Sequence, residues 1–163
     1  MNLRVTSMRP VPAEVREFQG EAPVPVVALA RRLGLKVYDE DTNAAISGRL
    51  TRDPAAGGPS GYAVYVNVAH HRHRKRFTLA HEIAHFLLHR HLLDAGIVED
   101  DALYRSHLST AVEAEANRFA AEILMPWHLI DRAIEQGITA PADLARLFQV
   151  SETAMRIRLG LPT

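Results

Sequence analysis

Two histidines, His81 and His85, lie four residues apart in a segment with helical periodicity, and a glutamate, Glu82, follows the first of them. On a helix, this spacing puts both imidazoles on one face, about 6 Å apart at Cβ. One zinc ion, about 2.0–2.1 Å from a nitrogen of each ring, fits that gap. Glu82 can then take a proton from water activated by the zinc without being a ligand itself. The pattern predicts a catalytic zinc site; the alternative is a solvated helix with two incidental histidines.

A catalytic zinc site needs a third protein ligand and one open position, and three residues are candidates for that ligand. His89 shares the helix face with His81 and His85, but it lies about 12 Å along the axis from His81, too far to share one ion. We expect His89 at the rim of the site or in packing. We expect His91 at the surface, because it points away from that face. Glu113 lies in a second predicted helix, where alanines on the same face allow a neighbouring helix to approach. Glu113 is the favoured ligand, with an ordinary surface glutamate as the alternative.

Other residues in and before this second helix are candidates for supporting roles. Asn117 lies one turn after Glu113 and is expected to contact a ligand histidine. Glu115 is rotated by about 200° from Glu113 and is expected to face elsewhere. Tyr104 and His107 lie between the two predicted helices, in a segment expected to border a substrate cleft, and are candidates for stabilising an oxyanion.

The segments around these residues predict both strands and helices. Strands are expected at 35–38, 46–51 and 62–68, and the Gly/Pro-rich residues 53–61 favour an antiparallel hairpin of the last two. Ser151 is expected to cap the N-terminus of the last helix. Helices are expected at 13–19, 26–33, 76–92, 109–124, 127–136, 141–148 and 152–159.

The composition limits the class of protein. The 163 residues, 47% of them hydrophobic, fit a single domain with a real core, which has an arm at 1–24 and a closing helix pair at 138–163. The chain has no cysteine, so its metal ligands must be His, Asp or Glu, and nothing indicates an oxidising compartment. A formal net charge of zero argues against a general attraction to nucleic acid. We find no signal peptide and no membrane-spanning run, so a cytoplasmic protein without membrane contact is expected.

Two further segments are candidates for contact with partners. The basic run at 70–76 holds three histidines and four cationic residues. A solvated loop leading into the next helix is favoured there; a second metal site, or contact with an acidic or DNA-bound partner, is the alternative. Residues 142–159 have the shape of a helix–turn–helix motif. Their apolar spacing, which includes Met155, Ile157 and Leu159, favours packing onto the domain, so direct DNA binding is not expected.

Two stretches make the chain recognisable: RFTLAHEIAHFLLH at 76–89 and EAEANRFAAEILMP at 113–126. Together they resemble the ImmA/IrrE family of bacterial and phage metallopeptidases. The resemblance extends upstream through VVALARRLGLKV and ISGRL, and downstream through ADLARLFQVSETAMRIRLG, so it covers most of the chain, from Pro25 to Leu161.

The resemblance implies a zincin-like α+β fold, in which a small antiparallel sheet packs on a mainly helical bundle that carries the HExxH helix. It implies a bound Zn²⁺ held by His81, His85 and Glu113, with Glu82 as the general base for peptide-bond hydrolysis. Related zincins often have aspartate where this chain has Asn117, so the ligand histidine beside it is expected to be less basic here.

The resemblance also implies a class of partner. Family members cut helix-turn-helix repressors, so the expected function is a zinc-dependent endopeptidase that makes limited cuts in an Xre-type transcriptional repressor. The alternative is a toxin-like or regulatory partner of an Xre-type protein that acts by binding, with zinc mainly structural. The presence of Glu82 argues against that alternative, because a structural zinc site has no use for this carboxylate. The substrate is expected to add as a strand to the edge of the hairpin that contains 62–68.

Overall fold

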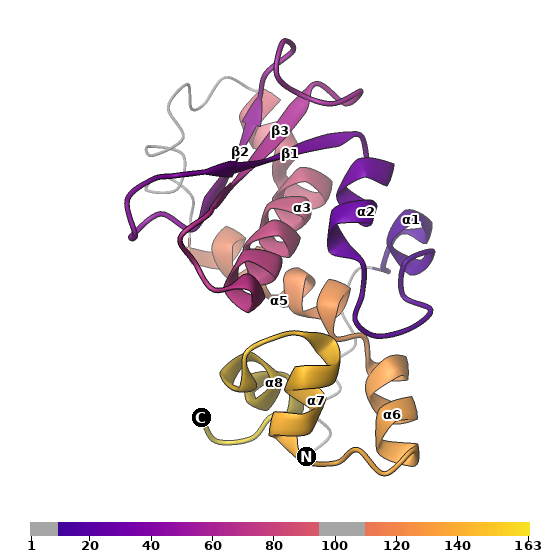
Figure 1. Ribbon diagram of the computed structural model, residues 1–163. Helices are drawn as coiled ribbons and strands as arrows, with labels where there is room; N and C mark the ends of the chain where they lie inside the picture. The colour runs from indigo at the N-terminus through magenta and orange to yellow at the C-terminus, as the bar shows by residue number, and fades with distance from the viewer. Residues whose placement is uncertain (1–9, 95–109) are drawn as a thin grey trace.

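A three-stranded sheet lies at one end of the computed structural model, which describes residues 10–94 and 110–163. Its strands are β1 (Leu35–Glu40), β2 (Gly48–Arg52) and β3 (Tyr62–Asn67), in the order β1-β3-β2 (Figure 1). The central strand β3 is almost entirely buried, as its run of aromatic and β-branched residues predicts. With helices packed on the sheet, the architecture is α+β, as expected.

The strands of this sheet do not all run antiparallel. β2 pairs antiparallel with β3, with Gly48 opposite Val66, which confirms the predicted hairpin. β1 runs parallel to β3, with Leu35 opposite Tyr62, so the expectation of an antiparallel sheet is wrong. After β1 the chain crosses to the far edge to form β2 and then returns through the middle as β3. The direction of β1 depends on that crossover, which the local residue pattern does not encode.

The long helix α3 (Arg72–Asp94) packs against the sheet and carries the HExxH segment (Figure 1). A Cβ atom at Gly48 of β2 would lie 2.5 Å from Thr78 Cγ2 on α3 and 2.6 Å from the carbonyl oxygen of Tyr65 on β3. Glycine is therefore required at this point, because the helix meets the strand backbone with no room for a side chain. This close contact sets α3 directly against the hairpin.

The basic run at 70–76 is predicted as a loop, but α3 begins at Arg72 and includes most of it. Arg76 Nε donates a hydrogen bond to the carbonyl oxygen of Gln149 at 3.2 Å, and its Nη2 donates to that of Val24 at 2.9 Å. One side chain thus joins α3 to both an N-terminal and a C-terminal segment. Part of the run therefore has a structural role, which a solvated loop would not have.

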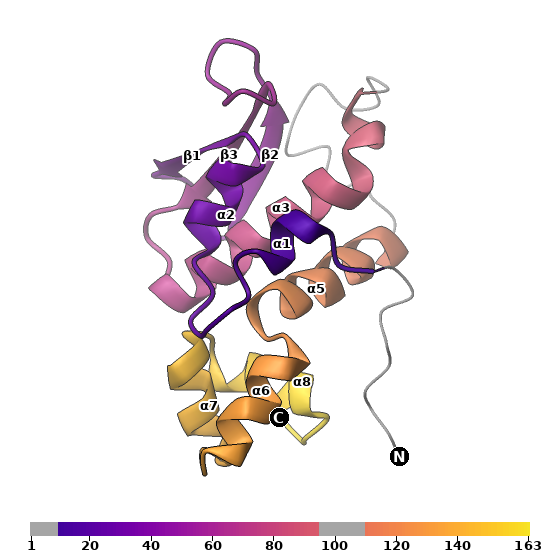
Figure 2. The same ribbon diagram turned by 90° about the vertical axis from the view of Figure 1, so that its right-hand side faces the viewer.

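A second helix, α5 (Thr110–Leu124), packs against α3 (Figure 2). Ala116 and Ala120 on α5 are fully buried, and their small side chains allow the close approach that the sequence predicts. In Figure 1, α2 lies beside α3, α1 lies next to α2, and α6 to α8 gather beyond α5. The bounds of these helices are Ala13–Arg16 (α1), Val26–Arg32 (α2), Trp127–Glu135 (α6), Pro141–Phe148 (α7) and Glu152–Leu159 (α8).

The last two helices follow most of the sequence-based expectations. Ser151 Oγ accepts a hydrogen bond from the amide nitrogen of Ala154 at 3.0 Å, which confirms the predicted N-cap. Leu144 and Met155 are buried, as the apolar spacing predicts. Ile157 is expected to pack as well, but it is 65% exposed. It follows Met155 by two residues and therefore projects from the opposite face of α8.

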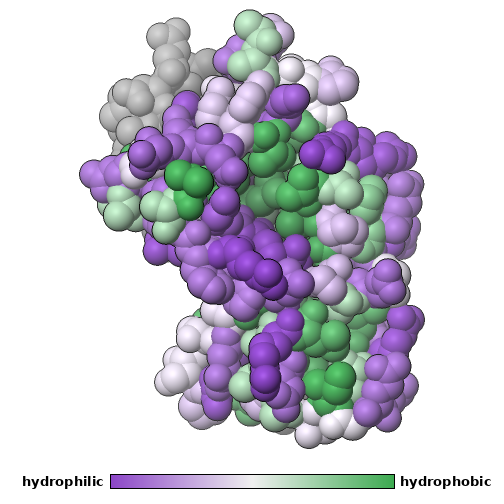
Figure 3. Space-filling model, in the orientation of Figure 1, coloured by the Kyte–Doolittle hydropathy of each residue, from purple (hydrophilic) through white to green (hydrophobic). Residues whose placement is uncertain are grey.

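The surface mixes hydrophobic and hydrophilic residues. On the face shown in Figure 3, hydrophilic side chains separate the hydrophobic areas from one another. The large hydrophobic side chains that are exposed belong to different parts of the chain: Val27, Val68, Ile134, Ile157 and Leu161. None of the described helices combines the length and the hydropathy that a membrane span requires.

Candidate metal centre

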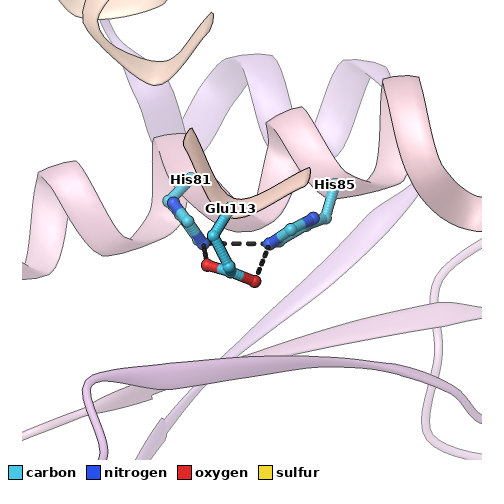
Figure 4. A group of neighbouring side chains, drawn as sticks. All are labelled: His81, His85 and Glu113. Carbon is cyan, nitrogen blue, oxygen red and sulfur yellow. Dashed lines mark hydrogen bonds and ion pairs between the residues drawn. The ribbon is translucent and has the colours of Figure 1, made fainter. Parts of the chain in front are cut away.

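Three side chains from two helices converge on one point (Figure 4). His81 and His85 come from successive turns of α3, and Glu113 comes from the first turn of α5. The Nε2 atoms of the two histidines lie 2.9 Å apart. Glu113 Oε2 lies 3.2 Å from His81 Nε2, and Glu113 Oε1 lies 3.2 Å from His85 Nε2. The structure thus brings together the three residues that the sequence predicts as metal ligands.

The atoms at this point include several hydrogen-bond acceptors that face one another, an arrangement that would bind a cation. His81 Nδ1 lies 2.8 Å from the acceptor Asn117 Oδ1, so a neutral His81 carries its proton on Nδ1 and presents a lone pair at Nε2. Glu113 Oε1 is buried and forms no hydrogen bond of good geometry within the described part of the chain. Ligand atoms held at about 2.0–2.2 Å by a tetrahedral zinc ion are about 3.3 Å apart, close to the spacing found here. The donor set therefore fits a divalent metal ion.

Charges around these residues shift two pKa values in opposite directions. Burial disfavours protonated His81, but interactions with Glu113 and Glu82 outweigh that effect, and the pKa of His81 lies above its ordinary value. Burial also disfavours the ionised form of Glu113, but the two facing histidines hold the pKa of this carboxyl group far below its usual range. Glu113 is therefore available as an anionic ligand, whereas His81, where it is protonated, must lose a proton before Nε2 can bind a metal.

Glu82 lies in the interior beside this point. Its side chain is almost fully buried, at 1% exposure, and its charge helps to raise the pKa of the neighbouring His81. On α3, Glu82 is turned by about 100° from His81, so it lies beside the ligand face and not on it. The proton-accepting role of Glu82 stays a prediction.

The two candidate ligand histidines are held from behind by different groups. His81 Nδ1 faces the Asn117 amide oxygen of α5, as the sequence predicts, and Asn117 is exposed. His85 Nδ1 instead lies 3.0 Å from His89 Nδ1, and the other nitrogen of His89, Nε2, lies 2.9 Å from Glu115 Oε2. Burial lowers the pKa of His89, although Glu115 acts in the opposite direction.

Sequence reasoning missed this second arrangement. His89 is buried, at 4% exposure, and contacts a ligand, so its assignment to the site rim or to packing is incomplete. The expectation that Glu115 faces elsewhere is wrong, because its carboxylate reaches α3. Ala116 is fully buried and lets the two helices approach closely. Glu113 and Glu115 project from α5 on either side of Ala116 around the helix axis, so both long side chains reach α3. A signal was present: His89 follows His85 by the same four residues that separate His85 from the preceding ligand.

Among the described residues, neither His91 nor the run at 70–76 joins the centre. His91 is exposed, as expected. Tyr104 and His107, the oxyanion candidates, lie outside the described residues. Within residues 10–94 and 110–163, the run at 70–76 forms no further group of metal-ligating side chains.

Comparison with known proteins connects this geometry to a family. Residues 30–160 match the family described as the IrrE N-terminal-like domain, Peptidase_M78. The chain is 35% identical over 140 residues to the radiation response metalloprotease IrrE of Deinococcus deserti, covering 77% of this chain and 49% of that protein. It is 38% identical over 101 residues to the protein of the same name from Deinococcus radiodurans, covering 59% of this chain and 30% of that protein. The chain belongs to the ImmA/IrrE family, and it spans about half or less of the length of these relatives.

A solved structure shows the same fold. A Mycobacterium tuberculosis transcriptional regulator is similar, with a TM-score of 0.60 and 23% sequence identity. The similarity covers 91% of this chain and 46% of that one. At this level of identity, the likeness concerns the fold alone.

Proposed function

We propose that the chain is a zinc-dependent endopeptidase with a zincin-like fold, which makes limited cuts in a helix-turn-helix repressor of the Xre type. The observation that carries the proposal is the convergence of His81, His85 and Glu113, whose candidate ligand atoms all lie within 4.8 Å of one another. The buried Glu82 follows His81 in the chain. The family supports it, since both relatives from Deinococcus are named metalloproteases. The choice of a repressor as substrate rests on the family resemblance.

In this proposal, each residue has a separate task. His81, His85 and Glu113 would hold the ion; when bound, zinc would supply Lewis acidity toward a peptide carbonyl and toward water. Glu82 would take the proton from the attacking water and pass it to the leaving amine nitrogen. Its burial keeps the carboxylate away from bulk solvent, which strengthens its interaction with the reacting groups.

The hairpin offers a place for the substrate. β3 is paired on both sides, and no other described strand pairs with the outer edge of β2 (Gly48–Arg52). An extended peptide added there would use backbone hydrogen bonds and would tolerate many side chains. Such binding suits an enzyme that cuts one exposed segment of a folded protein.

The test is the change Glu82→Gln, which removes the base and keeps the size and the ligands. We expect the rate of repressor cleavage, followed by gel electrophoresis and mass spectrometry, to fall by roughly 10²–10⁴-fold. Zinc content should not change. Glu135→Gln, an exposed position on α6, serves as the matched control.

Two outcomes would contradict the proposal. Unchanged cleavage by the Glu82→Gln variant would exclude this residue as the base. A stable, uncut complex between the unmodified chain and the repressor would favour the alternative, in which the protein regulates its partner by binding and zinc is mainly structural.

A further inference from the structure

His85 is the most enclosed of the three candidate ligands, and its support is also enclosed. The exposed fractions of the His85 and His89 side chains are 2% and 5%, against 13% for His81. His89 has no place in the ligand set, since it lies behind His85 on the side away from Glu113. A buried imidazole normally needs a partner for each nitrogen, and His89 has one for each: His85 and Glu115.

The possible hydrogen bonds in this row run in a single direction. The Glu115 carboxylate can only accept, so His89 Nε2 carries a hydrogen and donates it over 2.9 Å. A neutral His89 then has a lone pair on Nδ1, which accepts the Nδ1–H of His85 over 3.0 Å. His85 is left with its lone pair on Nε2, the atom that faces Glu113 and His81. Any other assignment of the two ring protons leaves two donors or two acceptors facing each other within this row. The chosen assignment leaves acceptors facing one another only at the two Nε2 atoms and Glu113, where a metal ion would lie between them.

We propose that His89 and Glu115 are positioning residues for the metal centre. They hold His85 in the one tautomer, and in the ring orientation, that present Nε2 to a metal ion. The inference rests on the metal centre of the proposed function and assigns a role to two residues outside its ligand set. Ligand histidines in metalloproteins commonly donate their other N–H to an acceptor that fixes the ring. Here the acceptor is a second imidazole, backed by a carboxylate from α5.

The alternative is that the pair only joins α3 to α5. A joining role would stabilise the metal-free and the metal-bound protein equally and would leave metal affinity unchanged. A positioning role acts on metal affinity, and it depends on an acceptor facing His85 Nδ1. The two roles are therefore separated by measuring the affinity and the metal-free stability of the same variants.

The experiment is a titration of the metal-free chain with Co²⁺, followed by visible absorption in competition with a chelator. We expect His89→Leu to weaken Co²⁺ binding by about 10–100-fold. His89→Asn should recover most of the affinity, because an amide oxygen near the position of Nδ1 can still accept from His85. His91→Leu and His91→Asn, at an exposed position of the same helix, are the matched controls and should bind Co²⁺ as the unmodified chain does.

A second variant tests the inference even if substitutions at the buried His89 prevent folding. The Glu115 side chain is 35% exposed, so Glu115→Gln should be tolerated. We expect it to weaken Co²⁺ binding by several-fold, because the amide oxygen still accepts from His89 but carries no charge. Thermal unfolding of each metal-free variant shows which of them are folded.

Some results would overturn the inference. The pair does not position His85 if folded His89→Leu and Glu115→Gln variants have Co²⁺ affinities within about twofold of that of the unmodified chain. Loss of such a partner usually has a much larger effect on metal affinity. The same conclusion follows if His89→Asn is as weak as His89→Leu. If the unmodified chain fails to bind Co²⁺, the metal centre itself is wrong and both proposals fall, a result distinct from the first two.

Discussion

His81 and His85 face the same point with the same atom, Nε2, but the protein supports them in different ways. Behind His81 is the exposed, neutral amide of Asn117. Behind His85 is a buried imidazole, His89, which is followed by the charged Glu115. A polar group in contact with water loses little when a partner is removed, whereas a buried one bears the whole cost of desolvation. From this comparison we expect the His85 side to combine metal binding with fold stability, and the His81 side to be the more open to solvent and protons.

Removing a candidate ligand should give the largest difference between the His81 side and the His85 side. His81→Ala and His85→Ala should each abolish stoichiometric zinc binding, measured by metal analysis after dialysis. In the metal-free protein, His85→Ala should lower the free energy of unfolding in urea by about 2–4 kcal/mol, because it leaves a cavity and an unpaired His89 nitrogen. His81→Ala should change it by about 1 kcal/mol or less. Equal destabilisation by the two changes would break the comparison.

Acidification should act through the His81 side. Because the pKa of His81 lies above 6.5 in the metal-free protein, protons compete with the metal from above that pH downward. Affinity for Co²⁺ should therefore weaken by about tenfold per pH unit below this pKa, as a one-proton competition requires. Glu113 adds no further loss until far lower pH, since its own pKa is depressed. An affinity that is flat between about pH 6 and 8 would contradict the expected competition.

The same shift has the opposite sign for the metal-free fold. Since the folded-state pKa of His81 is raised, protonated His81 stabilises that fold, and this contribution is lost as the pH rises through the folded pKa. Metal affinity and metal-free stability should thus change in opposite directions over one pH range. Urea unfolding of the metal-free chain over the same pH range provides the check.

The smallest effect is expected from making the two sides more alike. Asn117→Asp would put a carboxylate behind His81, and we expect it to tighten Co²⁺ binding by a few-fold, because a charged acceptor makes the imidazole more basic. The gain should be modest, since Asn117 is exposed and solvent screens the new charge. Asn117→Leu, which removes the acceptor, should weaken binding, but less than His89→Leu does. The reverse order would show that burial does not decide the strength of the support.

The sequence predicts the helices well, and the reason is local. The predicted ranges 141–148 and 152–159 agree with α7 and α8, because apolar period and capping residues such as Ser151 lie within the segments themselves. The same periodicity places His81 and His85 on one face of α3. For Glu113, two small buried residues on one face of α5 were a sufficient signal of a close helix contact.

What could not be predicted depends on contacts between distant segments. The direction of β1 follows from the path of the chain through β2 and β3. Glu115 was assigned from the rotation of one isolated helix, but its reach depends on how closely α5 lies against α3 at Ala116. The start of α3 at Arg72 is likewise supported by contacts such as that of Arg76 with the carbonyl oxygen of Gln149. None of these distances is contained in a residue pattern.

The hydrogen bond between His89 and Glu115 also has a consequence for how the two residues change in evolution. The two positions are 26 residues apart in the chain, yet Glu115 is one of the two partners of the buried His89. A lineage that loses Glu115 leaves the buried His89 Nε2 without this acceptor, so the two positions should tend to change together. Asn117, which is itself exposed to water, can change alone at a lower cost to stability. In this family, the positions that are inherited together would then lie on two helices, α3 and α5, and would extend beyond the HExxH motif.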